Sequence, residues 1–178
     1  MADTKLTGLT ATTTPDATDL LYIVTDVSGT PTSKKIAHSD ALFGLQAASV
    51  NLTNAQLLAL FTTPITLVAA GGANTIIQVL TVSVALDNAA GVYTGGGNMV
   101  VRIGTTQSLG ILANTTFFTA DAAASKLTWN PMGSSALTSV HVNAALVVSN
   151  NTADFGGGNA ANKATVKVIY RILTTLPA

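Results

Sequence analysis

The stretch Ala164-Thr-Val-Lys-Val-Ile-Tyr-Arg-Ile-Leu173 decides the fold class of this 178-residue chain. Its alternate positions separate into two sets. The apolar set is Ala164, Val166, Val168, Tyr170 and Ile172. The mostly polar set is Thr165, Lys167, Ile169, Arg171 and Leu173. A period of two residues is typical of a strand with one buried face. Gly156-Gly-Gly-Asn159, just before it, favours a turn because these residues tolerate positive φ. We therefore predict a half-buried strand whose backbone groups need neighbouring strands.

Similar runs recur upstream. The longest is Thr75–Asp87, in which Leu80, Val82, Val84 and Leu86 are expected on one face. The other predicted strands are Leu20–Val24, Ser33–Ala37, Ile65–Ala69, Asn98–Ile103, Thr115–Thr119, Lys126–Asn130 and Ser139–Ser149. Short strands at irregular spacings, with long Gly, Asn and Ala loops between them, favour a mainly β fold. We predict an antiparallel, jelly-roll-like β-sandwich with an extended N-terminal arm and one or two short helices.

Three regions are expected along the chain. Residues 1–43 form an attachment arm with a β-hairpin, residues 44–63 a short helical connector, and residues 64–178 the β-sandwich. In the connector Ser39–Ala48 is weakly helical. Asn54–Phe61 is a better helix, because Thr53 and Gln56 match a capping box and Pro64 enforces its end. A lone hairpin is marginal in water, so we expect it to dock on a partner; the alternative is that it folds onto its own domain.

The charge content is low. Charged residues make up 9% of the chain, apolar residues 48%, and the net charge is zero. Without a basic stripe the chain is not expected to bind nucleic acid, and no apolar run is long enough for a membrane span or a signal peptide. So little charge protects poorly against association. We expect the outer faces to be covered by further copies or by a partner; the alternative is a neutral, stable β protein.

The sequence lacks the usual residues of enzyme sites. It contains no glutamate and no cysteine, which removes most glycosidase acid–base pairs and all thiolate chemistry. Asp87, Asp121 and Asp154 each lie beside a predicted loop, where solvation or a turn explains them. His38 and His141 lack the neighbouring ligands that zinc requires. We predict no catalytic residue, no cofactor and no metal.

Three aromatic residues lie in or near predicted loops. Tyr93, Trp129 and Phe155 could form a platform on which a sugar ring stacks, which would indicate a carbohydrate-binding module. The alternative is that these rings fill the ends of the sandwich. Both interpretations stay open at this point.

Two stretches resemble virion proteins of tailed bacteriophages. Thr4-Lys-Leu-Thr-Gly through Leu-Leu-Tyr-Ile-Val-Thr-Asp26, followed by Ser28-Gly-Thr-Pro-Thr-Ser-Lys-Lys-Ile-Ala-His-Ser-Asp-Ala-Leu42, resembles the N-terminal attachment segment of phage fibre and decoration proteins. Asn159-Ala-Ala-Asn-Lys through Ile-Leu-Thr-Thr-Leu176 is similar to the last strand of small β-sandwich domains in the same kind of protein. Together they cover less than half of the chain.

The resemblance implies a structural subunit, commonly a homotrimer, that is anchored by its N-terminus in the virion and assembled in the host cytoplasm. Because the chain lacks the repeats and coiled coil of long fibres, we expect a compact capsid decoration or head-fibre subunit. A tail-fibre or neck adaptor subunit is the alternative. We expect residues 1–43 to bind the major capsid protein or another virion protein. The residues expected to dock are Leu20, Leu21, Tyr22, Ile23, Val24, Lys34, Lys35 and Ile36.

Overall fold

The structure of the protein is a computed structural model. It describes residues 20–25, 32–37, 44–88, 91–104, 107–119, 126–131 and 141–174, and for 20–25, 32–37, 107 and 126–131 it describes the backbone alone. The chain divides into two compact units, Met1–Leu45 and Gln46–Ala178.

The first unit contains the hairpin predicted from the sequence. Strands β1 (Leu20–Thr25) and β2 (Thr32–Ala37) pair antiparallel, with Leu20 opposite Ala37 at one end and Thr25 opposite Thr32 at the other. These bounds agree with the predicted strands to within one residue. The rest of the predicted attachment arm, residues 1–19, 26–31 and 38–43, lies outside the described residues.

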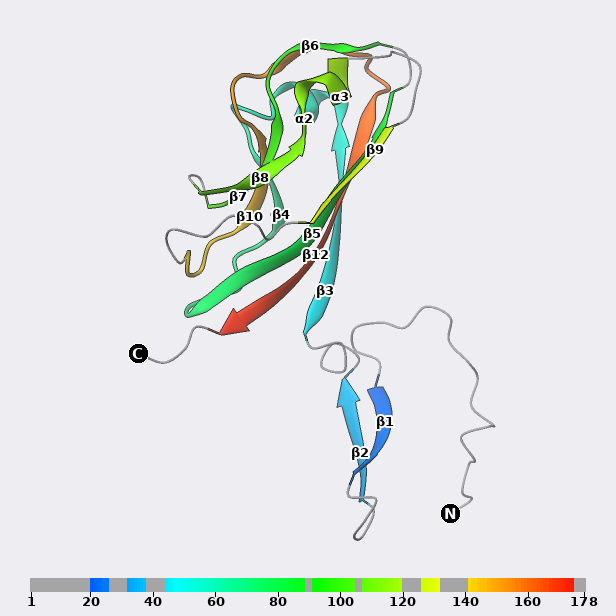
Figure 1. The fold of residues 1–178 in the computed structure, drawn as a ribbon, viewed down its shortest axis with the longest axis vertical. Helices are drawn as coiled ribbons and strands as arrows, with labels where there is room; N and C mark the ends of the chain where they lie inside the picture. The colour runs from blue at the N-terminus through cyan, green and yellow to red at the C-terminus, as the bar shows by residue number, and fades with distance from the viewer. Residues whose placement is uncertain are drawn as a thin grey trace, which may run out of the picture. The chain divides into compact units, whose positions relative to one another are not determined.

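The second unit contains two four-stranded sheets (Figure 1). One has the order β3 (Leu45–Thr53), β12 (Lys163–Thr174), β5 (Thr75–Asp87) and β9 (Lys126–Pro131); the other has the order β4 (Ile65–Val68), β10 (Leu146–Asn150), β7 (Met99–Ile103) and β8 (Gln107–Ala113). The helices α2 (Asn54–Leu58) and α3 (Thr115–Thr119) lie at one end of the sheets, near the small pair β6 (Tyr93–Gly95) and β11 (Phe155–Gly157). The described residues are thus mainly β, with antiparallel sheets and two short helices, as predicted. No helix in the described part is long and apolar enough to cross a membrane.

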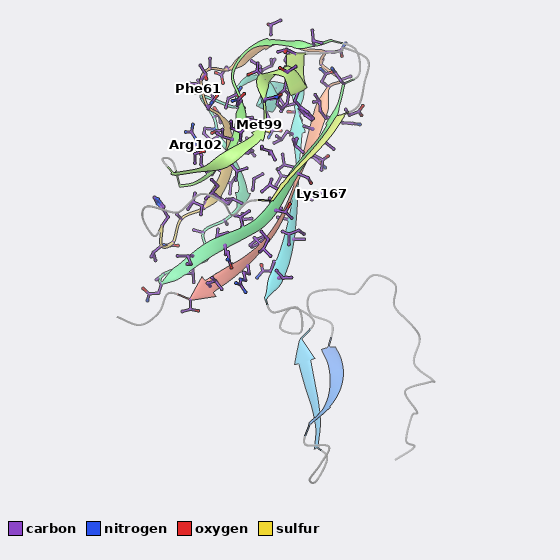
Figure 2. All side chains as sticks on the ribbon, viewed as in Figure 1. Phe61, Met99, Arg102 and Lys167 are labelled. Atoms are coloured by element: carbon purple, nitrogen blue, oxygen red, sulfur yellow. The ribbon has the colours of Figure 1, made fainter. Side chains whose placement is uncertain are left out.

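The terminal strand β12 supplies much of the core. It pairs with β5 from Lys163 opposite Asp87 to Thr174 opposite Thr75. The predicted apolar set is confirmed for four of its five members, because Ala164, Val166, Val168 and Tyr170 are buried. The fifth, Ile172, is only partly buried against the core. They join a single hydrophobic cluster with residues of the other sheet, among them Val101, Leu146 and Val148. Figure 2 shows Met99 between the sheets and Lys167 on the outside of β12.

A β-bulge reverses the facing of β5 at its middle. The register jumps from Ile169 opposite Thr81 to Tyr170 opposite Val79, so Leu80 has no opposite residue. Such an extra residue shifts the alternation by one position. Val82 is buried on one side of the bulge and Val79 on the other, whereas Leu80 is 38% exposed. The prediction that Leu80 faces inward is therefore wrong.

The predicted connector, residues 44–63, is only partly helical, because it contains β3 as well as α2. The prediction of a weak helix at Ser39–Ala48 is wrong from Leu45 onward, where β3 begins; residues 39–43 lie outside the described part. Local helix propensity is overridden because Ala48, Val50 and Leu52 alternate toward the core.

The predicted capping box of α2 is confirmed. The Gln56 amide donates to the Thr53 hydroxyl at 3.3 Å, and Gln56 Oε1 accepts from the Thr53 amide at 2.9 Å.

Two predicted strands require correction. Thr115–Thr119 is the helix α3, because Asn114 Oδ1 accepts a 3.0 Å hydrogen bond from the Phe117 amide in the manner of an N-cap. The strand predicted at Ser139–Ser149 begins only at Leu146. Before it, Asn143 has a φ of +51° and donates its amide to the Thr75 carbonyl at 2.8 Å. Val142, an apolar residue within the range of the predicted strand, is exposed. Strands β6, β8 and β11 lie in stretches where the sequence predicted no strand.

Candidate interaction sites

The residues expected to dock on a partner lie in β1 and β2. Leu20, Leu21, Tyr22, Ile23, Val24, Lys34, Lys35 and Ile36 all belong to the two paired segments. The register sets Tyr22 opposite Lys35 and Ile23 opposite Lys34. Within the described ranges this sheet has two strands only. Each strand therefore has a second edge with backbone groups that a strand of another molecule can pair with.

Two of the three candidate sugar-stacking residues lie in an aromatic cluster at one end of the sheets. Tyr93 comes from β6, Phe155 from β11, and Phe118 from α3. The ring centroids are 5.4 Å apart for Tyr93 and Phe155, 4.8 Å for Phe118 and Phe155, and 6.0 Å for Tyr93 and Phe118. These distances are those of packed aromatic pairs. The three segments thus meet on one set of rings.

The rings of this cluster face the core. Tyr93 and Phe118 are fully buried and Phe155 is 5% exposed. Neither Tyr93 nor Phe155 presents a ring face to solvent on which a sugar could stack, and both instead close the end of the core. Trp129 lies in β9 opposite Ser83, and the structure describes its backbone alone. The sequence analysis did not predict that Phe118 belongs to this cluster. Asn114 followed by Thr115 and Thr116 is a recognisable start of a helix, which would have indicated it.

A polar network surrounds the Tyr93 hydroxyl. This hydroxyl donates to Asn54 Oδ1 at 2.8 Å, and the buried Asn162 donates through Nδ2 to the Gly91 carbonyl at 2.8 Å. Burial raises the pKa of Tyr93, and a side-chain hydrogen bond with Asn162 opposes that rise. The phenol is therefore held neutral, as a hydrogen-bonding and packing group.

Asparagine side chains hold other loops at this end. Asn151 Oδ1 accepts from the Asn98 amide at 2.8 Å, and the Asn151 amide donates to the Asn98 carbonyl at 3.0 Å. Asn98 Oδ1 in turn accepts from the Thr115 amide at 3.0 Å. These contacts connect the turn after β10, the start of β7 and the start of α3 without using a charge. Uncharged amide groups thus hold these three segments together.

The described aspartates take part in structural contacts. Asp154 Oδ1 accepts from the Phe61 and Thr62 amides at 2.7 and 3.1 Å, and Oδ2 accepts from the Thr62 hydroxyl at 2.9 Å. Desolvation acts to raise the pKa of Asp154, but the three hydrogen bonds from Thr62 and Phe61 outweigh it, so this pKa lies below its ordinary value. Asp87 forms an exposed ion pair with Lys163 at 3.4 Å.

Metal-binding residues do not gather in the part of the chain that the structure describes. No group of three or more His, Cys, Asp or Glu side chains occurs there. Asp121 and His38 lie outside the described residues.

Comparison with known protein families, curated proteins and solved structures finds no match for this chain.

Proposed function

We propose that this chain is a non-enzymatic structural subunit of a tailed-bacteriophage virion, a capsid decoration protein anchored through residues 1–43. The observation that carries the proposal is the separate N-terminal unit, whose described sheet consists of the two strands β1 and β2 alone. A two-stranded sheet is marginal by itself, and its open edges suit strand addition to another protein. The resemblance of residues 4–42 to phage attachment segments supports the same role.

The second unit suits a part that is assembled and left exposed on a particle. We propose that the second unit, Gln46–Ala178, which includes nearly all of β3 besides the predicted residues 64–178, is a jelly-roll-like sandwich that protrudes from the shell. The resemblance implies three copies in each assembly. The loops around it are held by amides, by buried rings and by the Asp154 carboxylate, none of which changes its protonation near physiological pH. Many copies on one shell would stabilise it by avidity even where each contact is weak.

Fractionated virion parts provide the test. Heads and tails of a phage that encodes this chain are separated, stripped of it, and incubated with the full chain or with residues 44–178. Circular dichroism and thermal melting first establish that both forms are folded. We expect the full chain to sediment with heads and the truncated chain to stay in the supernatant.

The alternatives are outcomes of the same experiment. Sedimentation with tails alone would support the tail-fibre or neck adaptor and overturn capsid decoration. Equal binding of both forms to heads would overturn the role of residues 1–43. A glycan array tests the carbohydrate-binding alternative. Glycan binding that disappears in Trp129→Ala would favour it.

A further inference from the structure

The four outer edges of the two large sheets differ in how they are protected against pairing with another strand. Natural sheets protect their edges by shortness, proline, charge or bulges. Strand β4 has four residues and follows Pro64. Strand β9 begins with Lys126 and ends with Pro131, which has no N–H to donate. Strand β8 contains Gly110 at a φ of +151°, and its register with β7 shifts twice.

Strand β3 has none of these protections. Its nine residues, Leu45-Gln-Ala-Ala-Ser-Val-Asn-Leu-Thr53, include no charged residue, no proline and no glycine. It lies at the end of its sheet, where β12 is its single strand partner among the described residues. A long, uncharged outer edge of this kind is a template for a further strand.

We propose that β3 pairs with β3 of a second copy of this chain. The two strands run antiparallel about a twofold axis at Ser49, which joins two four-stranded sheets into one of eight strands. In this register Ser49 meets Ser49 of the second copy, and Ala48 meets Val50 of the second copy. Such a contact is isologous, because the same surface is used by both partners.

Both faces of β3 suit this register. On the inner face Ala48 and Val50 are partly buried against the core. Pairing sets each of them beside its apolar counterpart and continues the apolar face across the axis. On the outer face Ala47, Ser49 and Asn51 are exposed and short. No charge on β3 opposes its own copy, and the whole chain has zero net charge.

This contact does not depend on the virion assignment. It joins copies in twos, whereas the resemblance to decoration proteins implies threes. The mass of the full chain in solution therefore separates the two assemblies. Failure of the β3 contact would leave the role of residues 1–43 untouched, because that role is tested by binding to heads.

Charge substitutions at the axis test the proposal by sedimentation equilibrium. In Ser49→Lys the new charge faces its own copy, so we expect the dimer to weaken by about tenfold or more. Ser49→Asp should have the same effect for the same reason. An equimolar mixture of the two variants should restore the dimer, because opposite charges then meet at the axis. Ala85→Lys is the matched control, since Ala85 is exposed on the same sheet face but in the interior strand β5.

The outcomes are distinct. A dimer that Ser49→Lys weakens, that the mixture restores and that Ala85→Lys leaves intact supports the contact. An unsubstituted chain that is a monomer or a trimer overturns it. So does a dimer that the two Ser49 variants leave unchanged, or a mixture that stays monomeric while each variant melts as a folded protein.

Discussion

The hydroxyl of Tyr93 donates a 2.8 Å hydrogen bond to Oδ1 of Asn54, 39 residues earlier in the chain. Tyr93 begins β6, and Asn54 is the first residue of α2, directly after the edge strand β3. The bond therefore connects the aromatic end of the core to the helix that follows β3. The bond is partly buried, because Tyr93 is buried and Asn54 is half-buried, so its loss leaves polar groups that water reaches only in part.

Removal of this hydroxyl should destabilise the fold modestly. We expect Tyr93→Phe to lower the free energy of unfolding by about 1 kcal/mol, since the ring is kept and one hydrogen bond is lost. Urea unfolding followed by circular dichroism measures this change. An unchanged unfolding midpoint would contradict a structural role for the bond.

The same residue predicts a loss of stability in alkali. The pKa of Tyr93 is raised in the folded state, so the neutral phenol stabilises the fold. That contribution is complete below the unfolded pKa of about 10 and is lost as the pH rises through the folded pKa. Thermal melting between pH 8 and pH 11 should show this loss. The loss should be smaller in Tyr93→Phe, which has no proton to release at this position.

A methyl group at Gly158 should disturb the same end of the core. A Cβ atom there would lie 2.7 Å from Tyr93 Cε1 and 2.8 Å from Asn54 Oδ1. Gly95 is the matched control, because its φ of +62° resembles the +74° of Gly158 but its Cβ would meet nothing within 4 Å. Both alanine variants bear the cost of positive φ. We expect Gly158→Ala to cost about 1–3 kcal/mol more than Gly95→Ala in urea unfolding; equal costs would contradict the crowding.

The Asp154 carboxylate should make stability depend on acid. Its folded pKa is below the unfolded value, so its contribution is present above the unfolded pKa and is lost as the pH falls through the folded pKa. When the melting temperature is recorded at decreasing pH from pH 5, it should begin to decrease at about pH 4, near the ordinary aspartate pKa. Asp154→Asn should melt at a lower temperature at pH 7 and show a flatter acid limb. A parallel acid limb in the variant would exclude Asp154 as its source.

Amide contacts should contribute more to stability than the exposed ion pair. Asn98→Ala removes the oxygen that accepts from the Thr115 amide, and we expect a cost of about 1–2 kcal/mol. Asp87→Ala removes the ion pair with Lys163, whose side chains are 53% and 68% exposed, and we expect less than about 1 kcal/mol. Unfolding at low and at high salt is the measurement. A larger loss in Asp87→Ala than in Asn98→Ala would contradict this ranking, and so would a loss in Asn98→Ala that high salt abolishes.

Some elements of the fold could be predicted from local patterns. The apolar set from Ala164 to Tyr170 is buried as the period of two indicated, and β5 has the predicted bounds. The capping box of Thr53 and Gln56 starts α2 as predicted. These features depend on residues a few positions apart, so the sequence pattern contains most of what decides them.

Other elements depended on partners far along the chain. Leu80 faces outward because of a bulge in β5 opposite β12. The strand expected at Ser139–Ser149 is interrupted at Asn143, whose amide donates a hydrogen bond to the Thr75 carbonyl. The Thr115–Thr119 segment has the β-favouring residues of a strand but forms a helix that inserts Phe118 into the aromatic cluster.

The sequence alone thus determined the strand-rich composition, the hairpin and the alternation of its longest strands. The tertiary structure decided which rings are buried together, where the alternation reverses and which of the described strands lie at the ends of the sheets. The physical reason is how far apart along the chain the interacting residues lie. A strand's two faces follow from its own residues, whereas burial, register and edge exposure follow from which distant segments pack beside it.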